Sequence, residues 1–346
     1  MARTRGSAVR VSSSRAAPLP ESFRVAVVGA GISGLACAST LKARGAHVAV
    51  FEASRRPGGR AATEITPAGS FDHGAQFFTA QSSDFESWAS AWCDERIVER
   101  WTAQVIALDG ERTLDKTASA KRYIVRDGMQ ALGRKLGANL DVRLDTPVAA
   151  VTRRGASWQL TDGKGQNLSH GGYDAVVIAV PNAAELLAAA PELAQRAKAI
   201  VWEPCWAALL AIEPASGFEF GGAFVNDHPA LGWVTREDSK LTPSAGGGER
   251  WVLHATARWS ALHLNRTAEE VAAMLAEAFA KRFNFGFRPT FIAGRRWVTA
   301  APANPLKDLY LWDASEKIGA VGDWCGGPRI EGAFLSGRAL GQNVLA

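Results

Sequence analysis

The chain has 346 residues, of which 47% are hydrophobic, so it is long enough to bury the cores of two domains. Its formal net charge is +5, but four arginines precede the first acidic residue, Glu21, and the rest of the chain holds 35 basic against 34 acidic side chains. This balance argues against a nucleic-acid partner, and no apolar run approaches the ~18 residues that a membrane span needs.

Residues 1–20 are rich in Arg, Ser and Ala, contain no acidic residue and end in Pro18-Leu19-Pro20. This composition predicts a disordered tail, and it lacks the apolar segment of a secretory signal. Two interpretations remain open. We favour an untargeted extension, which implies a cytoplasmic protein, while the alternative is an organelle transit peptide.

The first predicted strand, residues 25–28, runs into a G-x-G-x-x-G motif made by Gly29, Gly31 and Gly34, which opens an apolar helix over residues 32–41. In a dinucleotide-binding turn the first glycine permits the tight bend, the second lets the backbone approach a pyrophosphate, and the third lets the helix pack on the strand. The N–H groups at the helix start then face the phosphates. The motif therefore predicts a dinucleotide site.

A second predicted strand, residues 48–51, supports this interpretation because it ends in Glu52, 21 residues after Gly31. That is the spacing of the acidic residue that binds a ribose. Gly58-Gly59-Arg60 follows shortly after Glu52. We expect this second loop to bring two glycines and a guanidinium group close to the phosphates of the same ligand. A nicotinamide cofactor bound by one βαβ unit does not need such a second loop, so we expect FAD, which is longer.

Two further segments resemble motifs of the FAD-dependent flavin amine oxidase superfamily. Phe71-Asp-His-Gly-Ala-Gln-Phe-Phe-Thr79 is similar to a D-x-G-A-Q-[YF] segment, and residues 322–337 are similar to the closing G-D…E-G-A…S-G flavin motif. Within the superfamily the chain resembles the small renalase-like oxidoreductases. The resemblance covers about residues 23–346, and its most specific motifs lie at the two ends.

The resemblance implies a set of cofactor contacts besides the glycines, Glu52 and Arg60. It places Asp323 where a carboxylate accepts hydrogen bonds from ribityl or ribose hydroxyls. It also points the N-terminus of a helix beginning at residues 330–333 toward the flavin, where the positive end stabilises the anionic reduced ring. We expect the backbone of Glu331, more than its carboxylate, to face the ring. The implied contacts are Ile32, Ser33, Ala53, Gln76, Phe77, Val148, Asp323, Glu331, Gly332 and Ala333.

The cofactor motifs occur in separated blocks, which predicts two domains that are discontinuous in sequence. We expect an α/β chain with a Rossmann-like FAD-binding domain of the glutathione-reductase type and a second α+β substrate domain with a mixed or antiparallel sheet. The first would hold residues 21–80, 139–183 and 311–346. The second would hold residues 81–138 and 184–310, including strands at 206–212 and 251–257 and a helix opened by the capping box of Thr267 and Glu270.

The four cysteines, Cys37, Cys93, Cys205 and Cys325, show no C-x-x-C and no histidine at a metal-ligand spacing, so we expect neither a disulfide framework nor a metal site. Cys325 lies in the closing flavin motif, where larger amine oxidases can carry a covalent thioether. Their attachment cysteine lies in a different sequence setting. We therefore expect noncovalent FAD.

The resemblance implies oxidation of the 2- and 6-dihydro isomers of NAD(P)H to NAD(P)+, with electrons passing through FAD to O2 and release of H2O2. Loss of hydride makes the nicotinamide ring aromatic, so positioning would carry this reaction without a general base. One alternative is a flavin amine oxidase or desaturase of a small organic substrate. Many amine oxidases place a lysine near flavin N5, for which Lys240 and Lys307 are candidates. A third reading, from another class, is a flavin-binding redox sensor or scaffold.

Three residues are candidates for the substrate pocket: His73, His254 and Trp297. Each has an equally simple structural explanation, because buried histidines and tryptophans often pack in cores with their polar atoms satisfied. We assign no residue as a general acid or base. The expected partners are a small-molecule substrate and O2, and the oligomeric state is left open.

Overall fold

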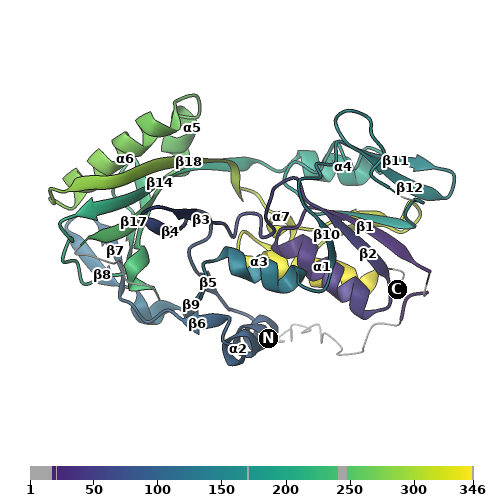
Figure 1. The fold of residues 1–346 in the computed structure, drawn as a ribbon, viewed down its shortest axis with the longest axis horizontal. Coiled ribbons are helices and arrows are strands. Elements are labelled where there is room, and N and C mark those ends of the chain that lie inside the picture. The colour runs from purple at the N-terminus through teal and green to yellow at the C-terminus, as the bar shows by residue number, and fades with distance from the viewer. Residues whose placement is uncertain (1–17, 21, 170, 241–247, 345–346) are drawn as a thin grey trace, which may run out of the picture.

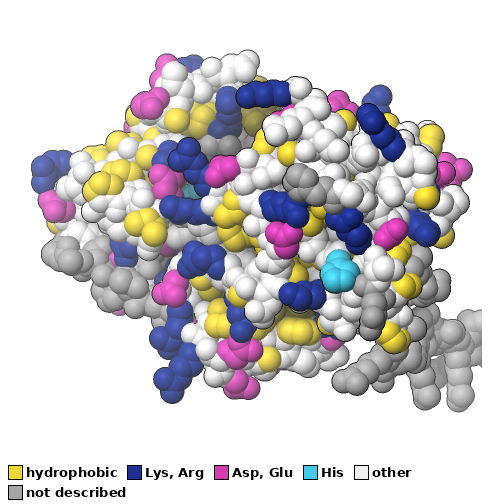
Figure 2. Space-filling model, turned by 45° about the vertical axis from the view of Figure 1, so that its right-hand side comes forward, with side chains coloured by type: hydrophobic (Ala, Val, Ile, Leu, Met, Phe, Trp, Pro, Cys, Tyr) yellow, Lys and Arg dark blue, Asp and Glu magenta, His cyan; other side chains and the backbone are white. Residues whose placement is uncertain are grey.

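The computed structural model describes residues 18–20, 22–169, 171–240 and 248–344. They form two layered units, each built on its own sheet, with long connecting strands between them (Figure 1). On the face shown in Figure 2, Lys and Arg side chains alternate with acidic ones and do not form one continuous patch. Within the described residues, no helix is both long and apolar enough to span a bilayer.

The first unit is a six-stranded sheet in the order β10-β2-β1-β13-β20-β19, parallel except for β19, which pairs antiparallel to β20. Its central strands are buried on both faces, which explains their continuous runs of Val and Ala. The strands are β1 Arg24–Val28, β2 His47–Phe51, β10 Asp141–Arg143, β13 Ala175–Ile178, β19 Leu311–Asp313 and β20 Ile318–Ala320.

Alternate side chains of this sheet enter two separate cores. One core is shared with α1 (Ile32–Ala43) and α8 (Ile330–Asn343), which pack against each other. The other is shared with α4 (Pro191–Lys198) and with the hairpin of β11 (Ala150–Arg154) and β12 (Ser157–Thr161). The sheet is therefore covered on both faces, as in a Rossmann-like domain.

The second unit is a seven-stranded mixed sheet in the order β18-β14-β17-β16-β15-β7-β8, in which only β15 and β7 pair in parallel. Helices α5 (Ala257–Leu262) and α6 (Ala268–Arg282) accompany it, and α6 begins with the predicted capping box. The strands are β7 Val105–Asp109, β8 Arg112–Asp115, β14 Trp202–Glu213, β15 Gly222–Val225, β16 Leu231–Arg236, β17 Glu249–Ala255 and β18 Arg288–Pro302.

Shorter elements complete the fold. They include the hairpin of β3 and β4, the three-stranded sheet β5-β9-β6, two 3-10 turns and three further helices. Their bounds are β3 Thr63–Thr66, β4 Gly69–Asp72, β5 Phe78–Thr79, β6 Val98–Arg100, β9 Arg122–Val125, η1 Thr117–Ser119, η2 Glu237–Ser239, α2 Ser83–Asp94, α3 Gln130–Gly137 and α7 Asp323–Gly326.

The structure confirms the expected fold class, a Rossmann-like unit with a second mixed-sheet unit. Three segments contact a different unit from the one expected. Helices α3 and α4 were expected in the second unit, but α3 packs on α1 and α4 packs on the first sheet. The β3–β4 hairpin was expected in the first unit, but it lies against β17 of the second. Residues 1–17 of the expected tail lie outside the described residues. Leu19, by contrast, is buried and donates its N–H to the carbonyl of Arg44 at 2.7 Å, so it does not share the disorder expected of residues 1–20.

Candidate functional site

A cavity of about 1030 Å³ lies between the two units. Its walls come from the β1–α1 turn, the loop after β2, the start of β3, the segment after β4, the end of β18 and the start of α8. The volume is at the top of the range for small-molecule sites, about 300–1,000 Å³. It therefore offers room for a ligand as long as a dinucleotide.

The first glycine motif shapes one end of this cavity. Gly29 has φ +106°, and a Cβ there would lie 2.7 Å from the carbonyl oxygen of Ala179. A Cβ on Gly34 would lie 2.0 Å from the carbonyl oxygen of Gly29, so this glycine allows α1 to pack against the turn. A Cβ on Gly31 would have nothing within 4 Å, although Gly31 lines the cavity. The second glycine thus leaves open space at the N-terminus of α1.

The second glycine loop docks directly on the first. The N–H of Gly58 donates to the carbonyl of Ala30 at 2.8 Å, and Gly31 and Gly58 form a parallel bridge. Glu52 holds the same turn, because its carboxylate accepts hydrogen bonds from the N–H of Ala30 at 2.7 Å and the N–H of Ser54 at 2.9 Å. The two loops that the sequence assigns to one site therefore meet at one end of the cavity.

Arg60 joins this loop to the C-terminal motif. Its guanidinium makes two hydrogen bonds to the carboxylate of Asp323, at 2.8 and 2.7 Å, and a third to the carbonyl of Ala300 in β18 at 3.0 Å. It also lies over the ring of Trp202, 5.3 Å from the centroid. Both Arg60 and Asp323 line the cavity.

The start of α8 supplies the second helix N-terminus at the cavity. Pro328, Arg329, Ile330 and Ala333 line the wall, while the first turn of α1 contributes Ile32 and Ser33. Two helix N-termini directed at one space make it favourable for anions and for developing negative charge.

The carboxylate of Glu331 turns away from the cavity. It accepts hydrogen bonds from the N–H of Gln81 at 2.9 Å and from the N–H and hydroxyl of Ser82 at 2.8 and 2.6 Å. Ser82 is the N-cap of α2, so Glu331 fastens α2 to α8. Gly332, next in the chain, packs against the carbonyl oxygen of Gly327, to which a Cβ would come within 2.2 Å.

His73, His254 and Trp297 meet in another part of the cavity wall, which we call the aromatic end. The carbonyl of His73 accepts a hydrogen bond from Nε1 of Trp297 at 2.9 Å and lies 3.1 Å from Nε2 of His254. A carbonyl only accepts, so Nε2 of His254 carries the proton. The rings of His73 and Trp297 stack with centroids 5.2 Å apart. Cys205 of β14 completes this corner.

These side chains are uncharged near neutral pH. Burial lowers the pKa of His254 to about 4 and also lowers the pKa of His73 below its ordinary value. Burial raises the pKa of the Cys205 thiol to about 12. None of the three is therefore poised to remove a proton at pH 7.

Several predicted contacts lie outside the cavity wall. Gln76 is buried, and its carbonyl oxygen accepts from Nε1 of Trp233 at 2.6 Å and from the hydroxyl of Thr235. Phe77 packs against Trp101 and Trp233. Residues 73–75, just before these two, still line the cavity. The chain then enters the second unit, where the side chains of Gln76 and Phe77 pack. Five further predicted contacts also lie outside the cavity wall: Gly34, Ala53, Val148, Glu331 and Gly332. Gly34 lies where α1 packs on the turn, Ala53 is exposed, and Val148 packs against the core that the first sheet shares with α4.

The two lysine candidates are also absent from the wall formed by the described residues. Lys240 is buried in an ion cluster with Asp72 and Glu237, and Lys307 is exposed. Sequence reasoning missed Cys205, Thr299, Ala300 and Ala301, which do line the cavity. They reach it through the pairing of β14 with β18, and only Trp297 marked that strand in the sequence.

Comparison with known proteins agrees with this architecture. Residues 27–95 match the family described as NAD(P)-binding Rossmann-like domain, and residues 99–201 match flavin containing amine oxidoreductase. Protoporphyrinogen oxidase 2, chloroplastic/mitochondrial, of Arabidopsis thaliana is 36% identical over 109 residues, which are 32% of this chain and 18% of that protein. Mitochondrial protoporphyrinogen oxidase of Nicotiana tabacum is 44% identical over 61 residues, 18% of this chain and 12% of that protein. The matches thus span less than a fifth of these relatives.

Solved structures with the same fold cover nearly the whole chain. A putative protoporphyrinogen oxidase from Exiguobacterium sp. 255-15 superposes with a TM-score of 0.74 at 15% identity, over 93% of this chain and 98% of that one. Cyclohexylamine oxidase from Brevibacterium oxydans IH-35A gives 0.70 at 14% identity, over 93% and 98%. Reduced UDP-galactopyranose mutase gives 0.73 at 10% identity, over 94% of both chains. At these identities the likeness establishes the fold alone.

Proposed function

We propose that this chain, a protein of the flavin amine oxidase superfamily by the matches above, is an FAD-dependent oxidase that takes electrons from a small organic substrate and passes them to O2. One observation carries the proposal. Two glycine loops and two helix N-termini line one cavity together with His73, His254 and Trp297, which form its aromatic end. This arrangement places an anion-binding end and an aromatic, uncharged end in one space.

The residues present fit FAD. The open position at Gly31, the N-terminus of α1 and the Arg60 guanidinium suit the pyrophosphate, and the Glu52 carboxylate suits a ribose. Asp323 and the N-terminus of α8 lie where they suit the ribityl chain and the ring. Bound FAD supplies the electron-accepting ring that no side chain can provide.

Noncovalent binding is supported by the state of the cysteines. Cys325 is buried and does not belong to the cavity wall, and burial together with the nearby Asp323 raises the pKa of its thiol. Burial likewise keeps the Cys205 thiol protonated. A protonated thiol is a poor nucleophile, so neither cysteine is suited to attach the cofactor.

The aromatic end favours an uncharged substrate. His73 and His254 are neutral near pH 7, and His254 donates its Nε2 proton to a backbone carbonyl. Nδ1 of His73 is buried and has no hydrogen-bond partner among the described residues. Glu64, a carboxylate of the wall, is paired with Arg295. An amine would therefore bind in its unprotonated form.

A second candidate is the oxidation of dihydronicotinamide isomers. The observation that favours it is the lack of a base at this end of the cavity: the histidines have low pKa values, and neither Lys240 nor Lys307 belongs to the described wall. A substrate that becomes aromatic on losing hydride needs only to be positioned. We place it second because the relatives found by sequence and structure include oxidases named for protoporphyrinogen and cyclohexylamine.

Anaerobic stopped-flow spectroscopy of the purified, FAD-loaded protein separates these readings. The oxidised-flavin absorbance is followed after mixing with cyclohexylamine, putrescine, protoporphyrinogen, 6-dihydroNAD or β-NADH, and H2O2 is assayed when air is readmitted. Bleaching by an amine or by protoporphyrinogen supports the main proposal, and bleaching by 6-dihydroNAD alone supports the second. Loaded protein inert to every reductant favours a sensor or scaffold, and protein that takes up no FAD overturns the flavin assignment.

The cytoplasm is the location we propose for the protein, with an organelle as the alternative. A fluorescent protein fused to the C-terminus of the full chain tests this, because it leaves residues 1–20 free to act as a targeting signal. Loss of an organellar signal on deleting residues 1–17 would favour the alternative.

A further inference from the structure

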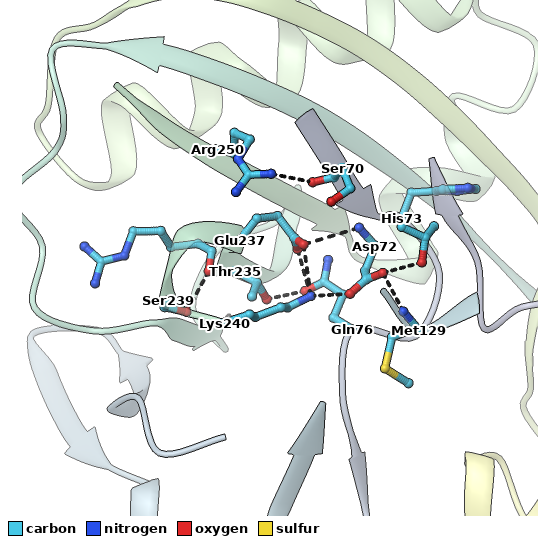
Figure 3. A network of polar contacts seen from close by, with 12 residues as sticks. Ser70, Asp72, His73, Gln76, Met129, Thr235, Glu237, Ser239, Lys240 and Arg250 are labelled. Carbon is cyan, nitrogen blue, oxygen red and sulfur yellow. Dashed lines mark hydrogen bonds and ion pairs between the residues drawn. The ribbon is translucent and has the colours of Figure 1, made fainter. Parts of the chain in front are cut away.

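Figure 3 shows a buried ion cluster of Lys240, Asp72 and Glu237, which adjoins His73 of the cavity wall. Nζ of Lys240 donates to Oδ2 of Asp72 at 2.7 Å and to the two carboxylate oxygens of Glu237 at 2.9 and 3.1 Å. The exposed fractions of the Lys240, Asp72 and Glu237 side chains are 9%, 4% and 6%. Ion pairs withdrawn this far from water depend on one another, because removing one member leaves an uncompensated charge.

Asp72 is the point where the cluster meets the rest of the site. Its Oδ1 accepts hydrogen bonds from the hydroxyl of Thr63 at 2.6 Å and from the N–H of Met129 at 2.9 Å. Its own N–H donates to Glu237 at 3.4 Å. Asp72 is thus held through both its side chain and its backbone by β3, the residue before α3 and η2.

The residues that follow Asp72 form the cavity wall. In this segment, residues 73–75, the N–H groups of His73 and Ala75 donate to the carbonyls of Ala62 and Arg60 at 3.1 and 2.9 Å. Gln76 closes the segment and is held by Trp233 and Thr235. The segment therefore runs between two buried polar anchors, Asp72 and Gln76, and each of them has partners among residues 233–240 of the second unit.

The cluster holds two carboxylates and one ammonium group. Burial raises the pKa of Glu237 to about 7; the attraction of Lys240 opposes this shift and the repulsion of Asp72 reinforces it. Burial alone would lower the pKa of Lys240, but the two carboxylates outweigh it and raise that pKa. Near neutral pH, Glu237 can therefore gain or lose a proton while Lys240 stays charged.

Two other charged groups line the small space around this cluster. Arg250 of β17 is paired with Asp238, and Arg126, just after β9, is paired with Glu99. Because each has its own carboxylate, neither neutralises the second carboxylate of the cluster. With Glu237 ionised the cluster carries one excess negative charge, and with Glu237 protonated it is balanced.

We propose that Lys240 and Glu237 are positioning residues that hold the wall segment 73–75 in place, and that loss of the Glu237 proton loosens this hold. The excess charge is relieved when the segment opens to water, so ionisation lowers the cost of local opening. The role of this segment beside a reacting flavin rests on the proposed function. The stabilisation of the segment by Lys240 and Glu237 does not depend on it.

Hydrogen exchange measured by mass spectrometry on the full chain, with and without added FAD, tests this. Peptides covering residues 72–76 are compared at pH 6 and pH 8 after correction for intrinsic exchange rates. In the unsubstituted protein we expect protection of the segment to fall by about tenfold from pH 6 to pH 8. The opened segment leaves Glu237 ionised at both pH values, whereas the closed segment keeps the Glu237 proton at pH 6 and has lost most of it at pH 8. Glu237→Gln should keep its protection at both pH values, and Lys240→Met should lose it at both.

The matched control is Arg282→Met, which removes a partly buried ion pair with Asp227 elsewhere in the second unit. It should leave protection of residues 72–76 unchanged; an equal loss there would show a global effect and overturn the proposal. The same pH response in Glu237→Gln as in the unsubstituted protein would also overturn it. If Lys240→Met does not fold, Lys240→Arg replaces it, and partial retention of protection is expected.

The two proposals fail separately in this design. Protein that takes up no FAD but shows the expected exchange pattern overturns the flavin assignment alone. Protein whose flavin is reduced by a substrate, but whose wall segment shows no dependence on Lys240 or Glu237, overturns only the positioning proposal.

Discussion

Arg60 and Asp323 form a bidentate ion pair across 263 residues of sequence, with Nη1 2.8 Å from Oδ2 and Nη2 2.7 Å from Oδ1. Two parallel hydrogen bonds fix both the distance and the orientation of the groups, which a single contact would not. The pair joins the second glycine loop to the start of α7. Two motifs that are far apart in the sequence are thereby brought to one wall of the cavity.

The substitution Arg60→Lys tests how much the site depends on this geometry. An ammonium group cannot reproduce the two parallel hydrogen bonds, so Asp323 loses part of its compensation. We expect FAD affinity to fall at least tenfold and the free energy of unfolding to fall by about 1–2 kcal/mol. Quenching of flavin fluorescence and chemical denaturation measure the two effects.

Arg153→Lys provides the matched control, because Arg153 pairs with Glu316 outside the cavity wall. It should leave the FAD dissociation constant unchanged. Equal affinity of Arg60→Lys and the unsubstituted protein for FAD would remove Arg60 from the cofactor site.

Two glycines of the first motif should respond differently to alanine. Gly31 has ordinary extended angles, φ −71° and ψ 175°, and a Cβ there meets nothing within 4 Å. Gly31→Ala should therefore keep its stability within about 0.5 kcal/mol but weaken FAD binding, since the methyl group enters the cavity. A Cβ on Gly34 would lie 2.0 Å from the carbonyl oxygen of Gly29, so Gly34→Ala should lose roughly 3 kcal/mol of stability.

Thermal unfolding of the cofactor-free proteins and FAD titration separate the two effects. A stable Gly31→Ala protein with unchanged FAD affinity would mean that the cofactor phosphates do not approach this turn.

Glu331 should prove structural although it lies in the flavin motif. Its carboxylate accepts three hydrogen bonds from Gln81 and Ser82 at the start of α2. Glu331→Gln removes the charge from these bonds, and we expect a loss of about 1.5–3 kcal/mol with no change in the bound-flavin spectrum. Glu269→Gln, at an exposed position in α6, is the control and should lose less than about 0.5 kcal/mol. A spectral shift in Glu331→Gln would place its side chain near the ring instead.

The cofactor end of the cavity could be predicted from the sequence because its determinants are local. A G-x-G-x-x-G turn and the strand end at Glu52 are set by short-range backbone geometry, and the structure places both at the cavity. Asp323 follows a short apolar strand in the same way. Placing these segments requires only that parallel strands present their carboxyl ends at one edge of the sheet.

The substrate end was less predictable because it depends on contacts between the units. Gln76 and Phe77 were expected at the flavin; they pack against partners from β16 and a neighbouring loop and do not belong to the cavity wall. Lys240 was considered for the cavity, but it pairs with Asp72, 168 residues earlier. Neither pairing has a local signature in the sequence. Such side chains can be placed only once the packing of the second sheet against β4 and the segment after it is known.

His254 should make the protein sensitive to acid. Its folded-state pKa, about 4, lies below the ordinary value of 6.5, so between these pH values the unfolded chain binds a proton that the folded chain does not. Stability is therefore lost as the pH falls from 6.5 toward 4, by roughly 2–3 kcal/mol from this residue. Glu237, with a raised pKa, acts in the opposite direction: its contribution is present at low pH and is lost as the pH rises toward about 7.

Comparison with His254→Gln isolates the histidine, because Glu237 and His73 contribute equally to both proteins. Glutamine retains an N–H that can donate to the carbonyl of His73 but does not titrate. Chemical denaturation at intervals between pH 7.5 and pH 4 should give curves that converge as the pH falls, with the variant losing about 2–3 kcal/mol less than the unsubstituted protein. Parallel curves would mean that His254 binds protons equally in both states, so that its environment leaves its pKa unchanged.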